Sequence, residues 1–391
     1  MPARKVYLDH SATTPLAAEV YEAMKPFLQE RYGNPNSLHS WGREARKAVD
    51  EGRASIARLI NAEPREIIIT GGGSEADNLA IKGTAFALQG RGRHIITSAI
   101  EHHAVIDTCK WLEKQGFELT VLPVDETGMV SIADLDAAIR EETILVTIMY
   151  ANNEVGTIQP VREIVRTARA KGVRVHLDGV QAVGHIPVDV KDLDVDLLTL
   201  SAHKMYGPKG VGALYVKRGV KLAPLVHGGG QEFGLRSGTE NTAGIVGFGA
   251  AAELANRRLE EGAVEEESRL KDLLINGITE KIPNAHITGH PVERLPFHAS
   301  VCFDYIEGES MLLRLDAAGI GASSGSACTS GSLEPSHVLL AMGIPHELAH
   351  GSLRLTLGKD TTEEDIVYVL EILPRVVSDL RALSPLGKEL S

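Results

Sequence analysis

Apolar residues follow two alternating patterns along this chain: short continuous runs typical of buried strands, and the spacing typical of helices. Runs rich in Ile, Val and Leu predict strands at residues 66–70, 94–97, 118–122, 144–149, 173–177, 197–200 and 211–216. Helical spacing predicts helices at residues 16–31, 42–60, 75–88, 103–115, 132–140 and 161–170. This alternation predicts an α/β fold whose mostly parallel sheet is covered by helices on both faces.

The pattern changes towards the C-terminus, where a long helical region is expected over residues 241–282. Beyond it, the spacing predicts strands at residues 300–305 and 352–356 and helices at residues 309–318, 335–342 and 363–383. We therefore expect a second, smaller α+β domain. No internal repeat or low-complexity tract is apparent.

Polar residues follow the ends of the predicted strands, where ligands bind in parallel sheets. They are Gly73 and Ser74; Glu101, His102 and His103; Asn152, Asn153 and Glu154; Asp178 and Gln181; and Ser201, His203 and Lys204. Each one alone has a structural explanation, as a helix cap, a satisfied buried histidine or a solvated turn. Polar groups at five strand ends together indicate a binding site.

A glycine-rich turn follows the strand at residues 66–70. Gly71, Gly72, Gly73 and Ser74 lead straight into a predicted helix, which is the layout of a phosphate cradle at the positive end of a helix. Many α/β turns are glycine-rich without binding anything. The turn is neither a Walker loop nor a dinucleotide fingerprint, because the required Lys-Ser/Thr pair and GxGxxG spacing are missing.

Lys204 follows a buried strand, in a turn that we expect to be exposed, with Ser201 and His203 before it. A surface lysine is the commoner explanation, and a free lysine is neutral less than roughly once in a thousand at pH 7. Such an amine becomes reactive only when it is desolvated or covalently engaged. A phosphate cradle, an amine and an acid such as Asp178 for a ring nitrogen are the groups that pyridoxal phosphate requires. An NAD or flavin site would not need the lysine.

Charge and composition narrow the class of partner. The 391 residues include 40 basic and 52 acidic side chains, a net charge of −12, and no dense Lys/Arg block. This balance argues against nucleic acid and anionic membranes as partners and favours metabolites or proteins. The N-terminus lacks a signal-peptide core and no apolar run approaches a membrane span, so we expect a cytoplasmic protein.

Three cysteines are too few for a disulfide framework and show no metal-ligand spacing. Cys109 falls in a predicted helix and Cys302 in a predicted strand, so we expect both to be packed in the core. Cys328 lies instead in SSGSACTSGS, residues 323–332, whose small polar residues cannot form a core. We expect this segment to be mobile and exposed, and its thiol to need local activation.

Nine strings resemble one family along nearly the whole chain, from about residue 6 to about residue 382. They are YLDHSATTP, YGNPNS, TGGGSEADN, EHHAV, ANNEVGT, HLDGVQA, SAHKMYGPKG, HGGGQEFGLRSGT and SSGSACTSGSLEPSH. They are similar to the cysteine desulfurases, pyridoxal-phosphate enzymes of the class V aminotransferase superfamily that supply sulfur for iron–sulfur clusters. The resemblance implies the PLP-dependent transferase fold type I, with a large domain over residues 14–258 and a small domain over residues 1–13 and 259–391.

The resemblance also implies a role for each matching residue. Lys204 would be the Schiff-base lysine, and His102, rather than His103, would stack on the pyridine ring and is a candidate for proton transfer. Further cofactor contacts would be Gly73, Ser74, Ser201 and His203 at the phosphate, Thr239 from the other subunit of a homodimer, Asp178 at the ring nitrogen, Gln181 at the phenolic oxygen, and Asn153. The substrate carboxylate would meet Asn153 and Arg354, with Asn34 nearby. Ser74 stands where a threonine is common, and it keeps the hydroxyl.

The implied reaction removes sulfur from L-cysteine. Lys204 would take the α-proton, and Cys328, on a mobile loop at about residues 323–335, would attack the substrate sulfur and carry it as a persulfide. L-alanine would leave, and the sulfur would pass to an iron–sulfur scaffold or another acceptor protein. No resident metal is expected, although Cys328 could contact a cluster on a scaffold transiently.

Other functions stay open on the sequence. Within the superfamily, an aminotransferase or a selenocysteine lyase would share Lys204 and Asp178, but an aminotransferase would not need Cys328. From a different class, a non-catalytic anion-binding α/β protein would use the glycine turn and keep Lys204 as a surface charge. The sequence leaves undecided the sulfur acceptor, which could serve general cluster assembly, nitrogenase or thiolation. It also leaves open the selectivity between cysteine and selenocysteine, and the scaffold-docking surface.

Overall fold

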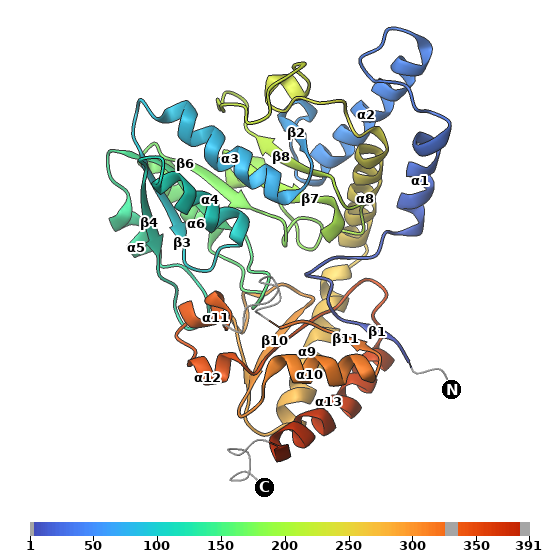
Figure 1. Ribbon diagram of the computed structural model, residues 1–391, viewed down its shortest axis with the longest axis vertical. Coiled ribbons are helices and arrows are strands. Elements are labelled where there is room, and N and C mark those ends of the chain that lie inside the picture. Colours follow the sequence, from blue (N-terminus) through green and yellow to red (C-terminus); the bar gives the residue numbers. More distant parts are fainter. Residues whose placement is uncertain (1–3, 325–334, 384–391) are drawn as a thin grey trace.

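The computed structural model describes residues 4–324 and 335–383. Its largest feature is a seven-stranded sheet with the strand order β2-β8-β7-β6-β5-β3-β4 (Figure 1). The strands are β2 (Ile67–Thr70), β3 (His94–Ser98), β4 (Glu118–Leu122), β5 (Thr143–Met149), β6 (Arg174–Asp178), β7 (Leu197–Ser201) and β8 (Gly212–Val216). All neighbours pair in parallel except β8, which is antiparallel to both β2 and β7. The expected mostly parallel sheet is confirmed.

Helices cover both faces of this sheet because alternate residues of each strand point to opposite sides. The helices are α1 (Ala18–Gln29), α2 (Ser40–Leu59), α3 (Gly73–Leu88), α4 (His103–Glu113), α5 (Ile132–Ala138), α6 (Val161–Ala170), α7 (Val190–Leu193) and α8 (Thr242–Glu260). Ile67 and Ile69 pack in the core shared with α2, α6 and α8, whereas Ile68 packs against α3 on the other face.

A second core lies around a smaller antiparallel sheet with the strand order β12-β10-β9, in the lower part of Figure 1. Its strands are β9 (Ala285–Ile287), β10 (His298–Phe303) and β12 (Ser352–Thr356), and its helices are α9 (Ala263–Lys281), α10 (Gly308–Ala317) and α13 (Glu363–Leu383). The short helices α11 (His337–Ala341) and α12 (His346–Ala349) lie beside it. Val6 and Leu8 join this core, and β1 (Val6–Tyr7) pairs in parallel with β11 (Ile320–Gly321). The domain boundary at residues 258 and 259 stays a prediction.

Several expectations differ from the structure. The helical region over residues 241–282 is two helices, because Gly262 adopts φ +86° between α8 and α9. The strand expected at residues 300–305 begins two residues earlier, as β10. The turn after β7 was expected to be exposed, and this is true only of its tip, Lys209 and Gly210. Ala202, Met205 and Tyr206 are buried, where the connection is bonded to the N-terminal segment.

Both cysteines that were assigned to packing are buried, as expected. Cys109 lies on α4 and Cys302 on β10, and neither is in a disulfide. Burial raises the pKa of both thiols, to about 12 for Cys302, so these sulfurs stay protonated and unreactive at neutral pH.

Candidate active site

The predicted site residues meet in a cavity of about 420 Å³ at the carboxyl ends of the strands. This is the position that the parallel topology favours for a ligand. The cavity is lined by Asp9, Ser11, Ala12, Gly73, Ser74, Asp77, His102, Met149, Ala151, Asn153, Asp178, Val180, Gln181, Ser201, His203, Lys204, Ser323 and Arg354. Every cofactor and substrate residue that was expected from the same chain lines this cavity, apart from Asn34.

The N-terminal segment, residues 9–14, forms one wall of this cavity. Thr14 bonds the carbonyl of His203 twice, through its main-chain N–H and its hydroxyl, each at 3.0 Å. The same Thr14 hydroxyl accepts a hydrogen bond from the N–H of Tyr206 at 2.8 Å. The segment is thus fixed to the connection that carries Lys204, although the two are almost 200 residues apart in sequence.

Lys204 ends a short 3₁₀ turn, Ala202–Lys204, that continues β7 into the cavity. Its Nζ donates to the main-chain carbonyls of Ser11 and of Ala12, the latter at 2.9 Å. Its own carbonyl is held by the Nε2 of buried His185 at 2.8 Å. The amine is therefore partly buried and directed into the cavity, in contrast to the surface charge that a non-catalytic protein would keep here.

Asp178 ends β6 and places a buried carboxyl group in the same cavity. Its Oδ1 accepts a hydrogen bond from the Val180 N–H at 3.0 Å. Burial raises the pKa of Asp178 above its ordinary value, although His102 and Lys204 counteract part of this increase. A cation placed against Asp178, such as a protonated ring nitrogen, would stabilise its ionised form. Gln181 lies nearby, and its Nε2 donates to the Ser11 carbonyl at 3.0 Å.

The glycine turn forms the anion-binding end of the cavity. Gly73 and Ser74 open α3, so the first N–H groups of this helix face the space. A Cβ added at Gly73 would lie 3.0 Å from the Val180 side chain, which explains the absence of a side chain there. The Oγ of Ser201 is buried and has no hydrogen-bond partner among the described residues. An unpartnered hydroxyl beside a helix N-terminus fits a phosphate group.

His102 caps α4, and its Nδ1 accepts a hydrogen bond from the Ala104 N–H at 3.1 Å. This bond leaves any proton of the neutral ring on Nε2. Burial lowers the pKa of His102 below its usual value and Lys204 lowers it further, whereas Asp178 opposes the shift. The imidazole is therefore mostly neutral at pH 7, as an aromatic ring that stacks on a cofactor should be.

Glu101, directly before His102, is completely buried. Its Oε1 accepts hydrogen bonds from the Ser98 hydroxyl at 2.5 Å and the Met149 N–H at 3.1 Å, and its Oε2 has no partner among the described residues. Burial raises the pKa of Glu101 to about 8, so this side chain stays protonated at neutral pH.

We expect Glu101→Gln to stabilise the protein progressively as the pH rises. The pKa of Glu101 is about 8 in the folded chain and near 4.5 when unfolded, so folding must keep the group protonated at increasing cost between pH 5 and pH 8. The neutral amide removes that cost, by up to about 4 kcal/mol at pH 8. Urea unfolding across this pH range measures the difference. Glu113→Gln, on an exposed position of α4, serves as control, and parallel stability curves for wild type and Glu101→Gln would refute the prediction.

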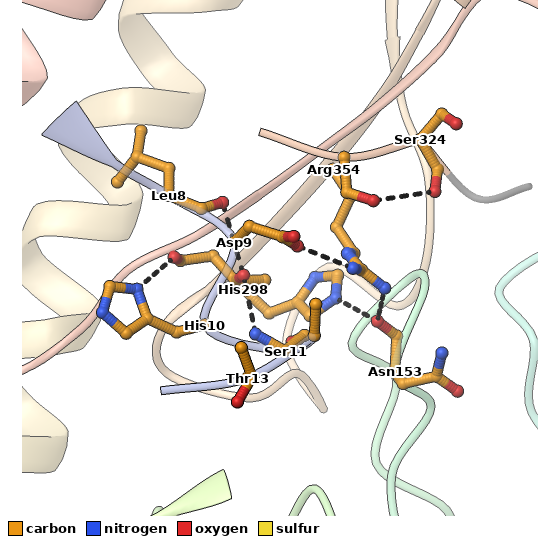
Figure 2. A network of polar contacts seen from close by, with 12 residues as sticks. Leu8, Asp9, His10, Ser11, Thr13, Asn153, His298, Ser324 and Arg354 are labelled. Carbon is orange, nitrogen blue, oxygen red and sulfur yellow. Dashed lines mark hydrogen bonds and ion pairs between the residues drawn. The ribbon is translucent and has the colours of Figure 1, made fainter. Parts of the chain in front are cut away.

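Arg354, on β12, also lines the cavity. Its Nη1 donates to the Asn153 carbonyl at 3.0 Å, and its Nη2 donates to the Asp9 carboxylate at 2.8 Å (Figure 2). The His298 Nε2 lies 3.1 Å from the same Asn153 carbonyl. A buried guanidinium next to an open cavity suits a carboxylate ligand.

Two predicted residues lie outside the cavity. Asn34 is exposed in a loop, where its Oδ1 accepts a hydrogen bond from the Asn36 N–H at 2.9 Å, and Thr239 is exposed as well. Neither lines the cavity of one chain, so their roles stay predictions. Cys328 lies outside the described residues, as does most of the expected loop.

Sequence reasoning missed Asp9, Ser11 and Asp77, which also line the cavity. Asp9 and Ser11 belong to YLDHSATTP, whose run of polar residues could have indicated a site. They were missed because they do not follow any of the predicted strands. Asp77 lies in the first turns of α3, hidden behind the glycine turn. Within residues 4–324 and 335–383, no three His, Cys, Asp or Glu side chains are grouped to hold a metal ion. No helix in this part of the chain is long and apolar enough to span a membrane.

Taken together, these groups fit pyridoxal phosphate. The cavity offers a lysine amine, a buried acid for a ring nitrogen, a neutral imidazole and an anion-binding turn with an unpartnered hydroxyl. These are the donor types that a phosphorylated pyridine aldehyde requires.

Comparison with known proteins gives the family. The family model "Aminotransferase class-V" matches residues 6–369. "Cysteine desulfurase IscS" of Dictyoglomus turgidum is 54% identical over 386 residues, which cover 99% of this chain and 98% of that protein. "Cysteine desulfurase IscS" of Methanosarcina thermophila is 55% identical over 383 residues, covering 98% and 94%.

Solved structures agree with this assignment. A structure titled "NIFS-LIKE PROTEIN" has a TM-score of 0.91 and 41% identity, and the match covers 96% of this chain and 100% of that one. Another, "SspA in complex with cysteine", has a TM-score of 0.78 and 37% identity, covering 90% and 99%. The expected fold class and family are therefore confirmed, and the chain belongs to the class-V aminotransferase family, among its cysteine desulfurases.

Proposed function

We propose that this protein is a pyridoxal-phosphate-dependent cysteine desulfurase that converts L-cysteine to L-alanine and collects the sulfur on Cys328. The observation that carries the proposal is the meeting of Lys204, Asp178 and Arg354 in one cavity. The full-length similarity to proteins named cysteine desulfurase supports it further.

The cofactor, when bound, accepts the electron pair released at the substrate α-carbon. Lys204 would anchor it covalently, Asp178 would meet the ring nitrogen and Gln181 the phenolic oxygen, with His102 against the ring. Its phosphate would lie at Gly73, Ser74, Ser201 and His203. Thr239 of a second copy would complete the phosphate site, and its exposure in one chain is compatible with that role.

The other end of the cavity orients the substrate. Arg354 would bind the α-carboxylate with Asn153 beside it, leaving the α-carbon near the amine of Lys204. This amine already lies against two main-chain carbonyls, which hold it in place for taking the α-proton. Asn34 would approach from the loop before α2.

Sulfur transfer would require Cys328 as its thiolate. Its Sγ forms a bond to the substrate sulfur while the substrate carbon–sulfur bond breaks, and the bonding pair stays with the carbon skeleton, which takes up a proton to become L-alanine. The enzyme then holds a persulfide that a second thiol can accept. We further propose a homodimer in the cytoplasm and delivery to an iron–sulfur scaffold or another acceptor protein.

Cys328→Ala tests the reaction type. We expect the variant to keep its coloured cofactor and to bind L-cysteine, but to lose alanine and persulfide formation by at least about 10³-fold, because the nucleophile is gone. Alanine is measured by chromatography, and protein persulfide by alkylation and mass spectrometry. Cys302→Ala, which removes a buried thiol, should retain turnover.

Two results would point to other chemistry. Alanine release at the wild-type rate by Cys328→Ala would remove this residue as the nucleophile. Keto-acid formation from L-cysteine by the wild type would favour an aminotransferase. Comparison of L-cysteine with L-selenocysteine as substrates separates a desulfurase from a selenocysteine lyase.

A further inference from the structure

Asp9 forms an ion pair with Arg354, the residue to which the proposed function assigns the substrate carboxylate. Its carboxylate lies 2.8 Å from Arg354 Nη2, and both residues line the cavity (Figure 2). The Arg354 side chain is only 3% exposed, whereas the Asp9 side chain is 20% exposed. Asp9 is the one acid paired with Arg354 among the described residues. The cation is therefore neutralised before any ligand arrives.

Both hydrogen-bond acceptors of this guanidinium lie on segments that make further contacts. Asp9 forms a parallel bridge with Thr356, and the next residues extend it, since the Ser11 N–H donates to the Thr356 hydroxyl at 2.9 Å. On the other side, the Asn153 carbonyl also meets the buried ring of His298. The main chain at Asp9 and the Asn153 carbonyl are thus each held by contacts other than the one to Arg354.

Arg354 keeps hydrogen-bond donors that Asn153 and Asp9 do not use. Its Nε is buried and has no partner among the described residues, and one hydrogen on each Nη is left after the bonds to Asn153 and Asp9. An α-carboxylate that binds the hydrogens left on the two Nη atoms, with Asp9 still in place, would be the second anion on one cation, and the first anion would repel it.

We propose that Asp9 is an affinity-setting residue, a resident counter-ion that weakens the hold of Arg354 on α-carboxylates. Without it, a buried guanidinium would meet the substrate with its charge uncompensated and would bind any carboxylate tightly, including that of the product. With it, the cavity binds the carboxylate through geometry and hydrogen bonds and can release L-alanine. This inference rests on the proposed role of Arg354.

Asp9→Asn separates charge from geometry, because the amide oxygen can still accept the hydrogen bond from Nη2. We expect the variant holoenzyme to bind L-alanine about tenfold more tightly than wild type, since one nearby negative charge is lost. Titration calorimetry and the absorbance change on binding L-alanine both measure this dissociation constant. A merely structural defect would weaken binding, so a gain in affinity is diagnostic. Unchanged or weaker binding by a folded Asp9→Asn variant would overturn the inference.

Two further variants complete the test. Arg354→Gln should weaken L-alanine binding by at least about tenfold. If it does so while Asp9→Asn binds as wild type, the counter-ion inference fails and the proposed function stands. If Arg354→Gln also binds as wild type, the counter-ion inference fails together with the carboxylate-binding role of Arg354 on which it rests. Asp365→Asn breaks another pair between the N-terminal segment and the second core, Arg4–Asp365, and should leave the constant unchanged. Melting temperatures of all variants establish that they are folded.

Discussion

Lys204→Ala is expected to abolish covalent attachment of the cofactor and to lower alanine formation by at least about 10³-fold. The amine would act twice, as the attachment point and as the base at the α-carbon, and no other lysine lines the cavity among the described residues. Borohydride treatment followed by denaturation measures attachment, because the reduced cofactor stays on wild type and washes away from the variant.

The matched control is Lys221→Ala, which removes an exposed lysine outside the cavity. It should keep both the attached chromophore and turnover. Retention of a covalently bound chromophore by Lys204→Ala would show that another amine holds the cofactor. The central assignment would then be wrong.

Asp178→Asn is expected to lower turnover by about 10²- to 10³-fold while leaving the cofactor-free protein more stable at alkaline pH. The loss follows because the isosteric amide cannot compensate a positive ring nitrogen. The gain follows because burial raises the pKa of Asp178 in the folded chain, so the wild type loses stability as the pH rises above the unfolded value. The opposite signs of the two effects distinguish a functional carboxyl group from a structural one.

Steady-state alanine formation and urea unfolding of the cofactor-free protein from pH 5 to pH 9 measure these effects. Asp136→Asn, at an exposed position of α5, should change neither. A folded Asp178→Asn variant that turns over L-cysteine like the wild type would exclude a role for this carboxylate in catalysis.

The large sheet could be predicted from the sequence because most of its strands are short apolar runs that are buried on both faces, whereas the edge strand β4 is partly exposed. The residues of β5 are buried along its whole length, and their nearly continuous apolar run is easily recognised in the sequence. The strand-end rule then brought Asp178, His102 and Lys204 together before any coordinates. Their distances and hydrogen bonds could not be predicted, because these depend on packing between distant segments.

The elements that escaped prediction are held by contacts far apart in the chain. Strand β1 is two residues long and exists because it pairs with β11, more than 300 residues later. The first part of the connection after β7 is bonded to the N-terminal segment, residues 9–14, and no local sequence pattern predicts this contact. Asp9 was not predicted as a site residue for the same reason, since its partner Arg354 lies on β12 of the smaller sheet, 345 residues later.

The carbonyl oxygens that receive Lys204 belong to the main chain of Ser11 and Ala12. Every amino acid carries such an oxygen, so evolution can vary these two side chains without losing the contact that steadies the amine. Single substitutions at Ser11 and Ala12 would therefore leave this contact in place, unlike a substitution at Asp9, whose side chain pairs with Arg354. The contribution of these two residues to holding the amine lies in the path of the backbone, which deletion or rerouting of the chain would change.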